Sequence, residues 1–93
     1  MRVLICEDSV LLREGLVRLL DHSGHRVVAD LPEASGLMPF LDSAPEEDFP
    51  QICILDVRLP PTYTDEGIRA ALEVRKKYPA LPLLVLSQYV EER

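Results

Sequence analysis

Four polar side chains stand directly after short apolar runs, and their types suit phosphate and metal chemistry. They are Glu7 and Asp8 after the run 3–6, Asp56 after the run 52–55, and Ser87 after the run 83–86. A carboxylate that is backed by apolar residues and open on its other side can attack phosphorus and form an acyl phosphate. Asp56 is the candidate for that role, and the Ser87 hydroxyl is a candidate hydrogen-bond donor to a phosphoryl oxygen.

The three acids also predict a cation site. Two like charges about 4 Å apart repel by about 4 kcal/mol at an effective dielectric of 20, so one carboxylate takes a proton or a cation sits among them. Oxygen ligands with room for water suit Mg²⁺ or Mn²⁺, which would neutralise an incoming phosphoryl group. We expect Glu7, Asp8 and Asp56 to hold such an ion; the alternative is that each acid is an ordinary loop or cap residue.

The elements that must position these residues follow from hydrophobic patterning. Runs 3–6, 52–55 and 83–86 are continuously apolar, as in strands buried on both faces, and the more polar run 25–29 is typical of an edge strand. Three helices are expected between the strands. The first spans 9–22, with Ser9 as N-cap and Gly24 after its end. The second spans 33–44 and is weakened by Gly36 and Pro39, and the third spans 65–78 and is ended by Pro79.

This alternation predicts an α/β fold with a doubly wound parallel sheet. Ligands of such sheets bind at the carboxyl ends of the strands, so neighbouring first and third strands would bring the three acids together. Segment 42–50 is expected to be an exposed loop, and 88–93 is a candidate start of a further helix.

Composition limits the function classes. A chain of 93 residues, 47% of them hydrophobic, fits one globular domain. Its net charge of -6 argues against a nucleic-acid surface, which needs clustered Lys and Arg. Cys6 and Cys53 sit inside apolar runs and are expected to be buried thiols. No apolar stretch approaches the roughly 20 residues of a membrane span, so we expect a soluble, intracellular protein.

The chain resembles the receiver domain of two-component response regulators over its whole length. The resemblance rests on Glu7-Asp8, Asp56, Leu59-Pro60 with the later Gly67, and Ser87. Stretches 6–16 and 56–67 look most like receivers joined to LuxR-type (NarL-like) helix-turn-helix domains. The resemblance implies a flavodoxin-like, CheY-like fold and phosphoryl transfer from a sensor histidine kinase, a cytoplasmic setting, and control of transcription through a DNA-binding domain.

The resemblance also implies individual roles. Asp56 would be the phosphoacceptor, and Glu7 and Asp8 would position Mg²⁺ together with the backbone carbonyl of Arg58. Ser87 would be the switch hydroxyl that moves toward the phosphate. Arg58 and Tyr89 occupy positions that tune dephosphorylation in this family.

Two features depart from the family pattern. The turn from Pro60 to Gly67 is about three residues longer than in the commonest receivers, counted on the sequence. The family's fifth strand, its Lys and its fifth helix have no counterpart, so we expect strand order 2-1-3-4, a partial receiver domain over 1–93 and no DNA-binding domain in this chain. The run 83–86 would then be an exposed sheet edge, which predicts a homo-oligomer.

Two alternatives remain open beside this regulatory, non-enzymatic reading. One is a Mg²⁺-dependent phosphatase of the haloacid-dehalogenase kind, which also uses an aspartyl nucleophile but wants a second Asp where this chain has Arg58. The other is a pseudo-receiver, a binding module with the same fold and no phosphorylation.

Overall fold

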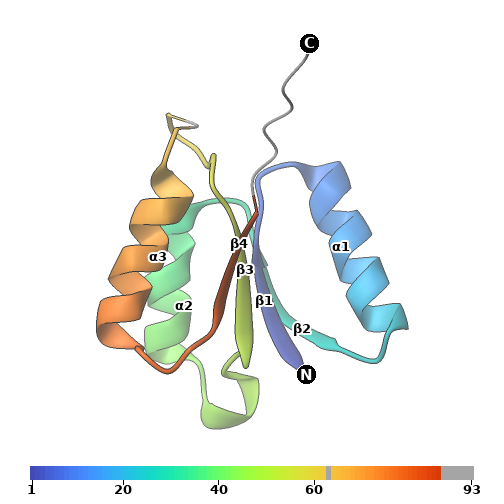
Figure 1. Ribbon diagram of the computed structural model, residues 1–93. Helices are drawn as coiled ribbons and strands as arrows, with labels where there is room; N and C mark the ends of the chain where they lie inside the picture. Colours follow the sequence, from blue (N-terminus) through green and yellow to red (C-terminus); the bar gives the residue numbers. More distant parts are fainter. Residues whose placement is uncertain (63, 87–93) are drawn as a thin grey trace.

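Strands and helices alternate along the chain, as the sequence predicts (Figure 1). The structure is a computed structural model that describes residues 1–62 and 64–86. The strands are β1 (Arg2–Cys6), β2 (Arg26–Leu31), β3 (Ile52–Asp56) and β4 (Leu83–Leu86). The helices are α1 (Val10–His22), α2 (Leu37–Ser43) and α3 (Glu66–Lys77), with short 3₁₀ turns η1 (Ala34–Gly36) and η2 (Glu46–Asp48). The expected helix start at 88–93 lies outside the described residues.

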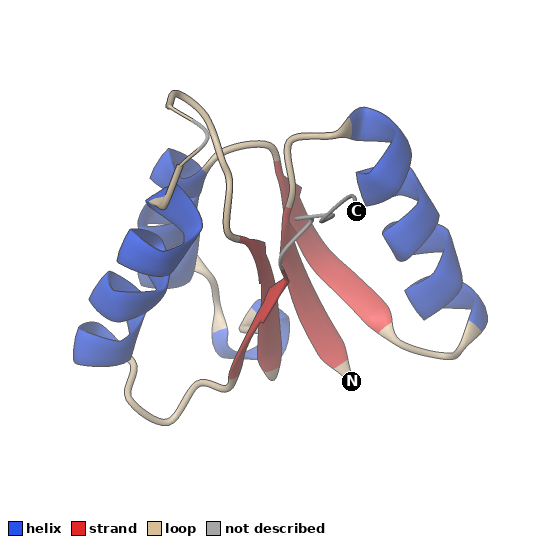
Figure 2. Cartoon of the chain, turned by 45° about the horizontal axis from the view of Figure 1, so that its top comes forward, coloured by secondary structure: helices blue, strands red, loops and turns tan. Residues whose placement is uncertain are grey.

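The four strands form one parallel sheet in the order β2-β1-β3-β4, which confirms the predicted topology. Helix α1 covers one face of the sheet, and α2 and α3 cover the other (Figures 1 and 2). The polar run 25–29 is confirmed as an edge strand, although β2 begins at Arg26 and continues to Leu31. With β1 and β3 as neighbours, the ends that carry Glu7 and Asp56 lie side by side.

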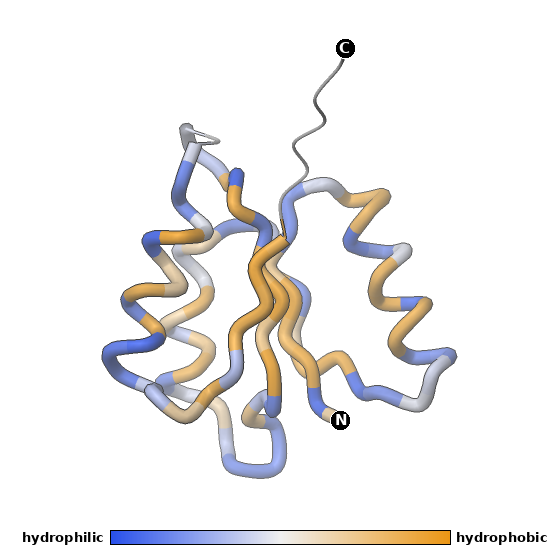
Figure 3. Tube along the Cα trace, viewed as in Figure 1, coloured by the Kyte–Doolittle hydropathy of each residue, from blue (hydrophilic) through white to orange (hydrophobic). Residues whose placement is uncertain are grey.

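The main core lies between the sheet and the α2–α3 layer. It is built from apolar residues of both central strands and of the covering helices and loops, namely Leu4, Cys6, Leu37, Leu41, Cys53, Leu55, Leu59, Val74 and Leu81. The orange strands of Figure 3 show this concentration of hydrophobic residues in the sheet. Cys6 and Cys53 are buried free thiols, as predicted.

Helix α1 is less buried than its many leucine and valine residues suggest. Its predicted N-cap is confirmed, since the Ser9 hydroxyl oxygen accepts a hydrogen bond from the Leu12 amide at 3.3 Å. Gly24 follows its end with φ of 86°, a conformation that suits glycine. Yet none of its residues is buried, and Leu19 is 62% exposed. Exposed apolar side chains therefore remain on this face among the described residues.

Two local predictions need correction. The expected helix 33–44 is divided, because α2 begins only after Gly36 and is preceded by η1. Pro39 lies in the first turn of α2, where a missing amide donor costs no helical hydrogen bond. Segment 42–50 is not simply an exposed loop: its first residues finish α2, η2 follows, and Pro50 is buried.

A contact between α2 and the end of α3 holds these two helices together. The Tyr78 hydroxyl donates to Asp42 Oδ1 at 2.5 Å, and Lys77 Nζ lies 2.7 Å from the same oxygen. The Tyr78 ring also packs at 52° against Phe49, with 5.4 Å between ring centroids. Hydrogen bonds from Tyr78 and Lys77 hold the pKa of Asp42 below its ordinary value. Lys77 at the end of α3 therefore has an acidic partner on α2.

Candidate functional site

The carboxyl ends of β1 and β3 bring the three predicted acids together. Glu7, Asp8 and Asp56 each place one carboxylate oxygen within 4.8 Å of the others. Glu7 is 3% exposed and Asp56 is 4% exposed, whereas Asp8 is partly open to solvent. Two buried carboxylates and one partly exposed carboxylate therefore form an oxygen-rich cluster, which we call the acidic pocket.

The Glu7 side chain is held by the turn that leads into α1. The main-chain amide of Glu7 continues the β1–β2 pairing by donating to the Leu31 carbonyl at 2.9 Å. The Oε1 atom of the Glu7 side chain accepts a hydrogen bond from the Ser9 amide at 3.0 Å. This hydrogen bond fixes the orientation of the Glu7 carboxylate at the end of β1.

The Asp56 carboxylate lies against the backbone of the following loop. The Arg58 amide is 3.3 Å from Asp56 Oδ1, the geometry of a hydrogen bond in which the amide donates. The Val57 amide donates to the Leu86 carbonyl at 3.0 Å, which keeps the chain beside β4 just beyond the acid. The Arg58 backbone thus lies beside the candidate site, and its carbonyl remains a predicted ligand. Ser87 and Tyr89 lie outside the described residues.

The pKa of the Cys6 thiol is affected by the negative charges of this pocket. Burial, together with the nearby Glu7 and Asp56 charges, raises the pKa of Cys6 to about 12. Burial raises the pKa of Cys53 to about 12 as well. A thiol with such a pKa is protonated at neutral pH and is a poor nucleophile, so the carboxylates are the candidate nucleophiles at this end of the sheet.

Gly67 lets the first turn of α3 approach the backbone of Asp56. Its amide donates to the Val57 carbonyl at 2.9 Å. A Cβ atom on residue 67 would stand 1.7 Å from the Asp56 carbonyl oxygen and 2.8 Å from the Val57 Cα atom. No side chain fits that space, so the close packing of α3 on the acidic strand end requires glycine. The sequence reading singled out Gly67 but not this contact.

The long turn before α3 is organised by Glu66, which the sequence reading missed. Glu66 Oε2 accepts hydrogen bonds from the Thr62 amide at 2.9 Å and from the Thr62 hydroxyl, and Oε1 accepts from the Thr64 amide at 3.1 Å. These bonds, led by the Thr62 hydroxyl, lower the pKa of Glu66 to about 2. Two threonines in the turn before an acid at the start of a helix are the local signal for such a tie, because threonine hydroxyls readily bond to nearby groups.

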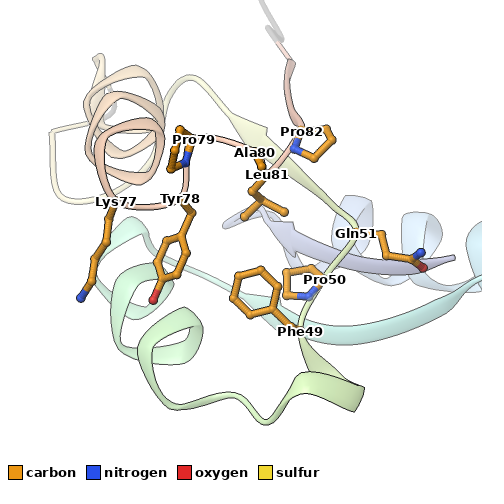
Figure 4. A pocket seen from close by; sticks show the side chains of 9 residues that line it. All are labelled: Phe49, Pro50, Gln51, Lys77, Tyr78, Pro79, Ala80, Leu81 and Pro82. Atoms are coloured by element: carbon orange, nitrogen blue, oxygen red, sulfur yellow. The ribbon is translucent and has the colours of Figure 1, made fainter.

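A second hollow lies at the opposite end of the sheet (Figure 4). Its walls are mainly apolar and include Phe49, Pro50, Tyr78, Pro79, Leu81 and Pro82. None of the three clustered carboxylates lines it. The hollow therefore has no part in the acidic site at the carboxyl ends of β1 and β3.

Comparison with known proteins agrees with the fold. Residues 3–93 match the response regulator receiver domain family. The virulence transcriptional regulatory protein PhoP of Salmonella typhimurium is 38% identical over 89 residues, covering 94% of this chain and 35% of PhoP. The transcriptional regulatory protein PdtaR of Mycobacterium tuberculosis is 32% identical over 88 residues, covering 95% of this chain and 39% of PdtaR. The chain therefore spans roughly a third of the length of these relatives.

Solved structures share the fold. RcsB from Salmonella enterica serovar Typhimurium, bound to promoter rprA with phosphomimetic BeF3-, superposes with a TM-score of 0.80 at 21% identity, over 98% of this chain and 72% of that one. TrrA from Thermotoga maritima, in complex with Mg²⁺ and BeF, gives a TM-score of 0.79 at 24% identity, over 95% of this chain and 70% of that one. The chain belongs to the response regulator receiver domain family. No helix in the described residues has the length and apolar content to cross a bilayer.

Replacing Gly67 by alanine is expected to disturb the site and destabilise the fold. The added methyl group meets the Asp56 backbone, so α3 or the end of β3 must move. Urea unfolding should show a loss of roughly 1–3 kcal/mol, the usual range for overpacking. Gly15→Ala is the matched control, because nothing lies within 4 Å of a Cβ there, and it should stabilise α1 by roughly 0.5–1 kcal/mol. Equal stabilisation by both substitutions would contradict the contact.

Replacing Glu66 by glutamine is expected to lower stability in a pH-dependent way. The pKa of Glu66 is depressed to about 2 in the fold from an ordinary 4.5, so its stabilisation is full above about pH 4.5 and is lost as the pH falls toward 2. The difference in free energy of unfolding between wild type and Glu66→Gln should shrink across that window. Glu73→Gln, at an exposed position of the same helix, should show no such trend; a constant difference for Glu66→Gln would refute the assignment.

Proposed function

We propose that this chain is the phosphoacceptor module of a two-component response regulator. The observation that supports the proposal most strongly is the meeting of Glu7, Asp8 and Asp56 oxygens within 4.8 Å at the ends of β1 and β3. Membership of the receiver family supports the proposed reaction class. We take residues 1–93 as part of one receiver domain that acts in the cytoplasm and controls transcription through a DNA-binding domain.

In the proposed reaction, an Asp56 carboxylate oxygen attacks the phosphorus atom of a phosphohistidine on a sensor kinase. The new bond is the oxygen–phosphorus bond of an acyl phosphate, and the phosphorus–nitrogen bond of the kinase breaks. The electron pair of that bond goes to the histidine ring, which takes up a proton. The Arg58 amide, 3.3 Å from Asp56 Oδ1, helps to orient the carboxylate for attack.

The acidic pocket fits a hard divalent cation. Its three donors are all carboxylate oxygens, and one of the acids is open to solvent, which suits an ion that keeps some water ligands. Glu7, Asp8 and Asp56 would hold Mg²⁺ or Mn²⁺, with the Arg58 carbonyl as a further ligand. When bound, the ion neutralises charge on the phosphoryl oxygens.

The remaining roles extend the proposal beyond the described residues. The Ser87 hydroxyl would move toward the phosphoryl group and report its arrival to the rest of the domain. Arg58 and Tyr89 would set the access of water to the acyl phosphate and so the rate of dephosphorylation. The output would be a change in the balance of two conformations that alters association.

The two alternative functions are less well supported. An aspartyl phosphatase needs a second carboxylic acid two residues after the nucleophile, and Arg58 occupies that position. A pseudo-receiver would need no acidic cluster, whereas all three acids are present and converge. We therefore regard the chain as a regulatory domain rather than an enzyme with turnover.

Asp56→Asn is expected to abolish phosphorylation of the protein. Incubation with acetyl phosphate and Mg²⁺ should add one phosphoryl mass to the wild type and none to the variant, because the amide is not a nucleophile at phosphorus. Asp21→Asn, an exposed acid at the other end of α1, is the control and should be labelled normally. Equal labelling of Asp56→Asn would refute the assignment, and steady turnover of a phosphate ester would favour the phosphatase alternative.

We also propose that this chain associates with a second copy of itself through β4. In the described residues β4 pairs with β3 on one side only. Leu84 is 47% exposed, and Val85 and Leu86 are 37% and 36% exposed. An apolar strand with an unpaired edge favours strand addition from another chain, and the exposed Ile68 and Leu72 of α3 lie beside this strand.

Light scattering is expected to show a dimer or larger species of this chain at high concentration. Leu84→Lys places a charge on the exposed surface of β4 and should shift the population toward monomer. Leu11→Lys, at a position 83% exposed on α1, adds the same charge elsewhere and should leave the mass unchanged. A wild-type monomer of ordinary stability would rule out association through this edge.

A further inference from the structure

Arg13 reaches from α1 back to the acidic turn. Its guanidinium donates from Nη1 to the main-chain carbonyl oxygen of Glu7 at 2.7 Å, and the contact is partly buried. The Arg13 amide donates to the Ser9 carbonyl at 2.8 Å, so its backbone is fixed by the first turn of the helix. A short hydrogen bond from a charged donor is among the stronger kinds in proteins. Arg13 thus links helix α1 to Glu7, the first residue of the acidic pocket.

The carbonyl that Arg13 contacts belongs to the peptide group between Glu7 and Asp8. A peptide group is planar, so fixing the direction of its carbonyl oxygen limits the direction in which the chain continues to Asp8. The Glu7 amide is bound to Leu31, and the Glu7 carboxylate accepts from the Ser9 amide. The three polar groups of Glu7 are therefore held from β2, from the turn and from α1.

The Arg13 guanidinium also brings a positive charge to the acidic turn, through its contact with the Glu7 carbonyl oxygen. A positive charge at this place has two opposite effects on a divalent cation. Its field repels the cation, whereas its hydrogen bond orders the carboxylates that bind the cation. The field is weakened by solvent because Arg13 is only partly buried, so ordering should prevail.

We propose that Arg13 is a positioning residue for the acidic pocket: it fixes the Glu7–Asp8 peptide so that both carboxylates face Asp56 before a cation arrives. The proposal deepens the proposed function and rests on it for the identity of the ion. It assigns a role in site geometry to a side chain that contacts neither the ion nor the phosphoryl group. Groups that orient metal ligands change metal affinity by roughly 10–100-fold when removed.

Titration of the purified chain with Mg²⁺ by calorimetry tests this role. Arg13→Met removes the donor and the charge, and the Mg²⁺ dissociation constant should rise by roughly tenfold. Arg13→Lys keeps the charge with a single point donor and should recover part of the loss. Arg18→Met, an exposed arginine on the same helix, is the control and should bind Mg²⁺ as the wild type does.

A second readout needs no metal. Hydrogen exchange of the Ser9 amide, which is bound to Glu7 Oε1, should be faster in Arg13→Met than in the wild type and unchanged in Arg18→Met. Unchanged exchange, unchanged or tighter Mg²⁺ binding by Arg13→Met, or an equal loss in Arg18→Met would each overturn the proposal. A wild type that binds no Mg²⁺ would contradict the proposed function, while the exchange result would still decide the role of Arg13.

Discussion

Mutual repulsion of three carboxylates at one end of the sheet is the constraint on which the rest of this structure depends. Two of them, Glu7 and Asp56, are almost fully buried, where an unpartnered charge is costly. The fold holds them with backbone donors and with packed elements on each side. The Ser9 amide binds Glu7, the Arg58 amide binds Asp56, and Gly67 lets α3 approach the backbone of the same strand end. A cation at the acidic pocket would reduce the repulsion among the three carboxylates.

Much of the fold could be predicted from local patterns. The apolar runs at 3–6 and 52–55 identify the central strands because a parallel sheet buries both of their faces. Strand-end placement then brings Glu7, Asp8 and Asp56 together by topology alone, and the structure confirms their convergence. The start of a helix is also predicted correctly where a cap residue is present, as at Ser9. Where Gly36 and Pro39 interrupt the pattern, local rules give a helix but misplace its beginning.

Contacts between separate elements could not be predicted from the sequence, because each depends on a side-chain direction set by tertiary structure. Arg13 reads as an ordinary surface residue of an amphipathic helix until the turn before the helix is known. Asp42 and Tyr78 are 36 positions apart and meet only when α2 and α3 pack on one face. The Glu66 tie is local, and the threonine spacing could have identified it. The long-range contacts leave no such signal.

The position of β1 has a consequence for the order in which the sheet can be completed. This strand lies between β2 and β3, so both of its neighbours leave the ribosome after it. Its buried residues Leu4, Ile5 and Cys6 stay without one flank until residues 52–56 have been synthesised. Pairing between distant segments is slow and leaves apolar surface uncovered meanwhile. The first of the described strands to emerge is therefore enclosed on both edges only after β3 has been made, and the acidic pocket comes into being at that step.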